Sequence, residues 1–86
     1  MRLSELFREV EFDGSIKNDA DINLVTDDSR LVRPGSLFVC IRHRSFDGHT
    51  AAVDALASGA AAVVTQDRLG LENELRVADS RSAYAR

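Results

Sequence analysis

The stretch LFVCI, residues 37–41, is a continuous apolar run that decides how this chain folds. Five apolar residues in a row are typical of a strand buried on both faces, as in a parallel sheet. The preceding stretch RPGS, residues 33–36, predicts a type II turn, because proline suits the second position of such a turn and glycine the third. Arg42 ends the run. The sequence therefore predicts a central strand over residues 37–41.

The segments that follow this strand complete a strand–helix–strand unit. Residues 51–58 predict a helix with Val53, Leu56 and Ala57 on one face. Asp47 or Thr50 can cap its start and Gly59 can end it. Residues 60–65 (AAAVVT) predict a second buried strand. A strand, a helix and a strand in this order form a βαβ unit with parallel strands.

Further elements are expected on both sides of this unit. Residues 22–26 (INLVT) and residues 75–78 (LRVA) predict strands, and apolar residues at helical spacing predict a helix over residues 2–10. Asp79 or Ser80 can cap a final helix that starts at Arg81. We therefore expect an α/β fold: a small mixed or parallel sheet of about four to five strands with two to three helices, in one domain over residues 1–86.

Composition excludes several functional classes. The net charge is −3, from 14 acidic residues against 11 Lys plus Arg, which argues against a nucleic-acid partner. A single cysteine, Cys40, can form neither an internal disulfide nor, with two histidines, a structural zinc site. The N-terminus lacks a signal-peptide core and the longest apolar run is too short to span a bilayer. We expect a cytoplasmic location and no membrane partner.

The charges are unevenly distributed along the chain. Acidic residues dominate between Glu5 and Asp28, whereas residues 30–44 contain four arginines and no acid. Two interpretations stay open at this point: a pair of solvated surface patches, or a local anion-binding site on an acidic domain.

Two polar loops are the candidate binding site. Residues 26–30 (TDDSR) follow the first predicted strand, and residues 42–48 (RHRSFDG) follow the second. Ligands bind at the carboxyl ends of strands in open α/β sheets, so the loops converge if the strands are parallel neighbours. Hydroxyl and backbone groups there suit the edge of a base, arginines suit a phosphate, and Phe46 suits a flat ring. The alternative is that these loops bind no ligand, that their arginines are solvated and that Phe46 belongs to the core.

Catalytic signatures are missing from the sequence. It contains neither a GxGxxG nor a GxxxxGK[ST] loop. Cys40 lies within an apolar run, where thiols are usually inert. We therefore expect no catalytic residue and no metal ligand in this chain.

Three ordered motifs resemble the N-terminal domain of the Mur ligases, the ATP-dependent enzymes of peptidoglycan precursor synthesis. Residues 28–39 (DSRLVRPGSLFV) are similar to the family pattern D-S-R-x-V-x-P-G-x-L-F-V. Residues 47–49 (DGH) and 59–64 (GAAAVV) resemble D-G-H … G-A-x-A-V-V, and residues 77–85 (VADSRSAYA) resemble the V-x-D-[ST]-R-x-A-x-A ending. The ending looks more like the E type, the tripeptide synthetase, than the F type, which adds D-alanyl-D-alanine.

The resemblance implies the role of individual residues. The domain would hold the UDP end of UDP-N-acetylmuramoyl-dipeptide, with Ser29 bonded to the uridine diphosphate and Asp27 beside it. Arg44, Ser45 and Phe46 would line the uracil site. The chain departs from the family pattern at His43, where the family usually has glycine.

The resemblance also implies what the parent enzyme does. ATP phosphorylates the carboxylate of the nucleotide-linked dipeptide, and an amino acid amine attacks the acyl phosphate. A central domain would bind ATP and Mg²⁺, and a C-terminal domain would select the amino acid. These two domains would be partners of this chain. By itself, the chain would carry no cofactor and no activity. The alternative of another class is a stand-alone α/β binding or regulatory module.

Overall fold

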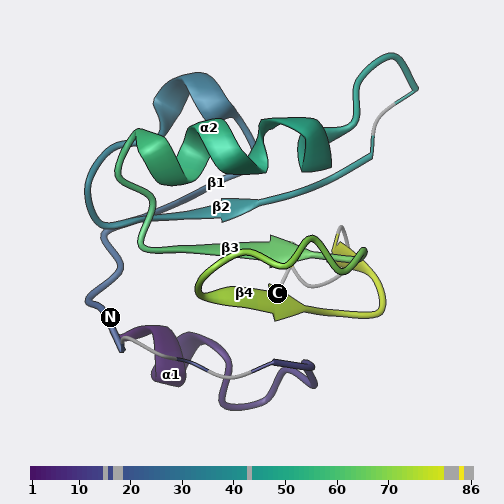
Figure 1. Cartoon of the computed structure of the whole chain (residues 1–86). Helices are drawn as coiled ribbons and strands as arrows, with labels where there is room; N and C mark the ends of the chain where they lie inside the picture. The colour runs from purple at the N-terminus through teal and green to yellow at the C-terminus, as the bar shows by residue number, and fades with distance from the viewer. Residues whose placement is uncertain (15, 17–18, 43, 81–83, 85–86) are drawn as a thin grey trace.

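A parallel sheet forms the centre of the molecule. The computed structural model describes residues 1–14, 16, 19–42, 44–80 and 84. Within that part of the chain, four strands lie side by side in the order β1-β2-β3-β4, all parallel to their neighbours. The arrows of β2, β3 and β4 in Figure 1 point the same way. The strands are β1 (Leu24–Thr26), β2 (Ser36–Val39), β3 (Ala62–Thr65) and β4 (Glu74–Arg76).

Helices and single turns connect the strands. The α-helices are α1 (Leu3–Leu6) and α2 (Ala52–Ala57), and the 3₁₀ turns are η1 (Ser29–Leu31) and η2 (Gly48–Ala51). The β2–α2–β3 unit is the predicted βαβ element, and Asp47 caps its first turn by accepting a hydrogen bond from the N–H of His49. The expected α/β fold is confirmed, with a parallel rather than a mixed sheet.

The two central strands are buried on both faces, as their apolar runs predict. Every residue of β2 and β3 is buried. Alternate residues point to opposite faces of a strand, so Leu37 and Val39 join one core cluster while Phe38 joins the other. The first cluster includes Leu3 from α1. The second contains the small alanines of α2, whereas Val53, expected on the packed face of this helix, is exposed. The sheet therefore separates two thin cores.

The first helix is shorter than its apolar spacing predicts. Only Leu3–Leu6 is α-helical rather than residues 2–10, and Phe7 is its C-cap. The chain then turns back, so that the rings of Phe7 and Phe12 meet edge to face at 5.3 Å. Leu3 and Phe7 are nevertheless buried in the core. The spacing identified the buried face correctly, but tertiary contacts ended the helix early, since short helices have little stability of their own.

Several predicted strand boundaries shift by one or two residues. The strand expected over residues 22–26 begins at Leu24, because the N–H of Ile22 donates instead to the carbonyl of Met1 (2.7 Å). The strands expected over 60–65 and 75–78 are Ala62–Thr65 and Glu74–Arg76. Ser80 and Tyr84 are helical; the rest of the final helix expected from Arg81, like His43, lies outside the described residues.

The turn before β2 has the predicted geometry. The N–H of Ser36 donates to the carbonyl of Arg33 (3.0 Å). Gly35, at the third position of this turn, has a φ of 88°, which a type II turn requires and glycine adopts readily. The turn directs the chain into β2.

Candidate functional site

The loops that follow β1 and β2 converge on one pocket, as the two polar segments predict for parallel neighbours. β1 pairs with β2 in parallel, so both loops leave the same edge of the sheet. A pocket of about 450 Å³ lies between them, lined by Asp27, Asp28, Ser29, Arg30 and Phe46. Four of these residues come from the first loop and the aromatic ring comes from the second.

A compact set of hydrogen bonds shapes the first loop. The hydroxyl of Thr26 accepts from the N–H of Asp28 (3.0 Å), and the Asp28 carboxylate accepts from the N–H of Arg30 (2.9 Å). The Arg30 guanidinium donates to the same carboxylate through Nε (3.0 Å) and Nη2 (2.9 Å). The hydrogen bonds from Arg30 to the Asp28 carboxylate lower the pKa of Asp28, and the bond from the guanidinium has the larger effect. They hold η1, and with it Ser29, at the pocket.

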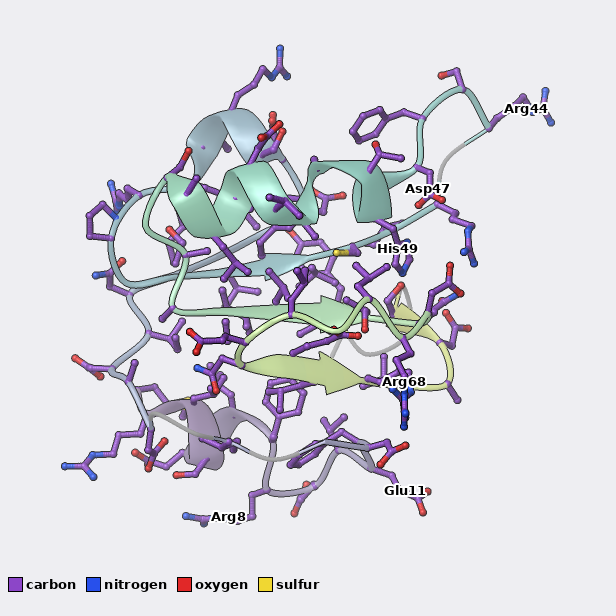
Figure 2. All side chains as sticks on the ribbon, viewed as in Figure 1. Arg8, Glu11, Arg44, Asp47, His49 and Arg68 are labelled. Carbon is purple, nitrogen blue, oxygen red and sulfur yellow. The ribbon has the colours of Figure 1, made fainter. Side chains whose placement is uncertain are left out.

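The second loop is closed at its base. Arg42 and Asp47 form an isolated antiparallel bridge, and the Arg42 Nε donates to the Asp47 carboxylate at 3.2 Å. Arg42 also forms an ion pair with Asp67, after β3. The N–H of Gly48 donates to the carbonyl of Ile41 (2.9 Å). The exposed tip therefore projects from a fixed base, and in Figure 2 Arg44 lies at this tip and points away from the body of the molecule.

The structure brings together three of the five predicted site residues. Asp27, Ser29 and Phe46 line one pocket, and the Phe46 side chain is 49% exposed beside it. Arg44 and Ser45 lie on the same loop and are exposed, but they are not among the lining residues. The roles of all five in ligand binding stay predictions.

Sequence reasoning included two lining residues in the candidate loop without giving them a role, and it missed one buried histidine. Asp28 and Arg30 line the pocket, and their place in the DSR motif was the available signal. His49 is buried between the carboxylate of Asp47 and the backbone of Gln66. The signal for His49 was its spacing two residues after an aspartate that caps a turn.

The thiol of Cys40 is part of the core, as its apolar surroundings predict. The residue is fully buried on the α2 side of the sheet. Burial raises the pKa of this thiol to about 12, so the reactive thiolate is scarce at neutral pH.

A second cavity has a different chemistry. About 340 Å³ in volume, it lies on the α1 side of the sheet, and its lining is apolar apart from one phenol: Leu6, Phe7, Val10, Val25, Leu37, Val39, Val64 and Tyr84. A charged nucleotide needs hydrogen-bond donors. The pocket between the β1 and β2 loops offers the Ser29 hydroxyl, whereas this cavity offers a single phenol. Among the described residues, no group of three or more His, Cys, Asp or Glu is placed to hold a metal ion.

Comparison with known families identifies the class of protein to which this fold and site belong. The family model described as Mur ligase family, catalytic domain, matches residues 21–84. The chain belongs to the Mur ligase family.

Individual relatives carry the name of one ligase. The UDP-N-acetylmuramoyl-L-alanyl-D-glutamate--2,6-diaminopimelate ligases of Listeria monocytogenes (strain EGD-e) and Syntrophomonas wolfei are 34% and 38% identical to it, over 87 and 91 aligned residues. Each alignment covers 99% of this chain but 18% of the relative. The chain thus spans less than a fifth of the length of the curated relatives it matches.

Solved structures show the same fold. MurF from Acinetobacter baumannii aligns with a TM-score of 0.76 at 23% identity, over 94% of this chain and 18% of that one. The MurF ligase of Thermotoga maritima, solved in complex with ADP, aligns with a TM-score of 0.67 at 27% identity, over 76% of this chain and 16% of that one. Within the described part of the chain, no helix is long and apolar enough to cross a membrane.

Proposed function

We propose that this chain binds the UDP end of UDP-N-acetylmuramoyl-dipeptide, as the substrate-anchoring domain of a ligase that adds the third amino acid to a peptidoglycan precursor. The observation that carries the proposal is the pocket between the β1 and β2 loops, which combines the Ser29 hydroxyl with the Phe46 ring. The names of the relatives at 34–38% identity support the substrate.

Each predicted residue has a chemical role in this proposal. The half-exposed ring of Phe46 offers a flat face on which uracil can stack. The Ser29 hydroxyl donates to or accepts from the nucleotide, and Ser45 offers a second hydroxyl on the facing loop. Asp27 lies beside the nucleotide. Arg44, exposed at the loop tip, supplies positive charge for the diphosphate.

Arg44 matters in this scheme because the arginine in the pocket is already engaged. The Arg30 guanidinium holds the carboxylate of Asp28 through two hydrogen bonds. Its charge is therefore balanced locally, and the charge of the diphosphate is left to the arginine on the opposite loop.

The reaction itself belongs to the proposed parent enzyme. There, ATP activates the carboxylate of the dipeptide and an amine attacks it, with ATP and Mg²⁺ held by a central domain and the amino acid selected by a C-terminal domain. The part played by this chain is positioning: binding energy at the remote uridine end lowers the cost of aligning the reacting carboxylate.

The tripeptide synthetase is favoured over the F-type ligase. The relatives that cover 99% of this chain are diaminopimelate ligases. The structural match to the MurF protein of Acinetobacter baumannii rests on 23% identity, which shows a shared fold alone. We therefore propose the dipeptide-linked nucleotide rather than the tripeptide-linked one as the ligand.

Calorimetric titration of the 86-residue chain tests the proposal. UDP-N-acetylmuramoyl-dipeptide, UDP and ADP are titrated separately into protein whose folding is verified by circular dichroism. We expect saturable binding of the two uridine ligands and none of ADP. Absence of uridine binding at millimolar ligand would contradict a self-sufficient site and favour the alternative of a binding or regulatory module with another ligand.

A further inference from the structure

A buried histidine lies at the base of the loop that carries Phe46. His49 is 8% exposed. Its Nδ1 lies 2.7 Å from the Asp47 carboxylate, and its Nε2 accepts the backbone N–H of Gln66 at 2.9 Å. A backbone N–H can only donate, so Nε2 carries the lone pair and Nδ1 carries the proton. The two partners thereby select one neutral tautomer of the imidazole.

The imidazole joins the ends of two strands. Asp47 closes the loop after β2, and Gln66 is the first residue after β3. Figure 2 shows the Asp47 and His49 side chains close together at this edge of the sheet, with Arg44 beyond them. The carboxylate of Asp47 also accepts the backbone N–H of His49 at 3.0 Å. The loop base is therefore connected to β3 through a side chain that is nearly inaccessible to water.

The connection continues to the segment after β4. The side-chain oxygen of Gln66 accepts from the N–H of Ser80 (2.8 Å) and from its hydroxyl (3.1 Å). A hydrogen-bonded path thus runs from Asp47 through His49 and Gln66 to Ser80. The ion pairs of Arg42 with Asp47 and Asp67 run beside it, so the path is a second link between the β2 loop and the end of β3.

We propose that His49 is a positioning residue for uridine-ligand binding: it holds the loop of residues 44–46 in its binding position by linking Asp47 to the backbone at the end of β3. The inference rests on the proposed function, because it assigns that loop to the ligand. His49 does not line the pocket, so it acts through Asp47 and not by contact with the ligand.

Two substitutions separate the two links of the imidazole. In His49→Asn, the side-chain amide nitrogen takes the place of Nδ1 and can still donate to Asp47, but nothing reaches Gln66. In His49→Gln, the amide oxygen takes the place of Nε2 and can accept the N–H of Gln66, while the backbone N–H of residue 49 still donates to Asp47. Both variants replace an imidazole by a smaller amide, so each serves as the packing control for the other.

We expect the link to β3 to decide the affinity. Calorimetry with UDP-N-acetylmuramoyl-dipeptide, under conditions in which circular dichroism shows both variants folded, should give a dissociation constant about tenfold weaker for His49→Asn, since a buried hydrogen bond is lost. For His49→Gln it should lie within about threefold of the parent value. Equal constants for the two variants, whether both weakened or both unchanged, would overturn the proposal.

A second measurement needs no ligand. Nitrogen-15 spectra of the parent chain should show Nδ1 protonated and Nε2 unprotonated at His49, and relaxation of the Phe46 amide should reveal greater mobility in His49→Asn than in His49→Gln. The opposite tautomer, or equal mobility, would overturn the positioning role. If no uridine ligand binds the parent chain, the proposed function fails, while the tautomer and mobility still decide whether His49 positions the loop.

Discussion

The side chains at the candidate site are of two kinds: some bind one another and some are exposed. Asp28 and Arg30 satisfy one another through a two-pronged interaction, which is the strong geometry for a guanidinium and a carboxylate. Their role is to shape η1 around Ser29. Arg44 and the Phe46 ring are exposed instead, which leaves them available to a ligand.

Replacement of Arg44 by alanine should weaken uridine binding without unfolding the protein. The side chain is exposed at the loop tip, so its loss removes little packing. Under the proposed function, it also takes away a charge-assisted hydrogen bond to the diphosphate. We expect affinity for UDP to fall by about five- to tenfold, with a urea midpoint close to that of the parent chain. Calorimetry and urea denaturation measure the two effects.

Arg33→Ala is the matched control for this substitution. Arg33 is also exposed, but it precedes β2 and so lies at the opposite end of that strand from the candidate binding loops. It should leave UDP affinity unchanged. Equal affinities of Arg44→Ala and the parent chain would remove Arg44 from the site.

At the level of elements, the turn before β2 depends on a glycine for two reasons. Gly35 has a positive φ, and a Cβ there would lie 2.4 Å from Nδ2 of Asn23. We expect Gly35→Ala to destabilise the chain by about 1–2 kcal/mol, from backbone strain and from displacement of Asn23. Gly70→Ala separates the two causes, because Gly70 has a φ of 75° and no atom within 4 Å of the added Cβ. Equal losses in urea denaturation would mean that the Asn23 contact contributes nothing.

Glu74 organises the loop between β3 and β4. Its carboxylate accepts the N–H groups of Leu69 (2.8 Å) and Leu71 (2.9 Å) and the hydroxyl of Thr65 (2.9 Å). Burial by itself raises the pKa of Glu74, but the hydrogen bonds to its charged form outweigh burial and hold the pKa below its ordinary value. Leu69 and Leu71 are thereby kept against the core on the α2 side.

This lowered pKa makes the stability of the fold depend on pH. The stabilisation is complete above the ordinary pKa of a glutamate, about 4.3, and is lost as the pH falls through the lower folded value. Glu74→Gln should cost about 1–2 kcal/mol at pH 7 and should flatten the decline in stability below about pH 5. Urea denaturation between pH 7 and 3 measures the unfolding free energy of both proteins. If the two free energies fall in parallel as the pH is lowered, Glu74 does not link stability to pH.

At the scale of the whole molecule, the two thin cores leave little reserve of stability. A chain of 86 residues is expected to unfold with a free energy of about 4–13 kcal/mol. Leu75 is fully buried between the sheet and the N-terminal segment. We expect Leu75→Ala to cost about 2–5 kcal/mol, a large part of the total.

The control for Leu75 is a leucine of the same chain that is mostly exposed. Leu31 has 57% of its surface exposed, so Leu31→Ala should change the unfolding free energy by less than about 0.5 kcal/mol. Urea denaturation at pH 7 gives both values. A loss at Leu75 as small as that at Leu31 would mean that the core relaxes around the missing side chain.

Much of the architecture could be predicted because local chemistry and tertiary structure agree. The apolar runs ending at Ile41 and Thr65 predict doubly buried strands, and both strands are buried throughout. The proline and glycine of residues 33–36 predict the turn that forms. The length of α1 could not be predicted, since the edge-to-face contact of Phe7 with Phe12 depends on where the chain turns back.

The fold class, the central strands and the family can be read from the sequence alone, because each depends on local propensity and on the order of motifs along the chain. Which polar residues share a pocket follows only from the tertiary structure. It placed Ser29 and Phe46 together, left Arg44 outside, and enclosed His49 between Asp47 and Gln66. The physical reason is that a pocket, or a hydrogen bond between the ends of neighbouring strands, depends on strand register and loop path, which no local pattern specifies.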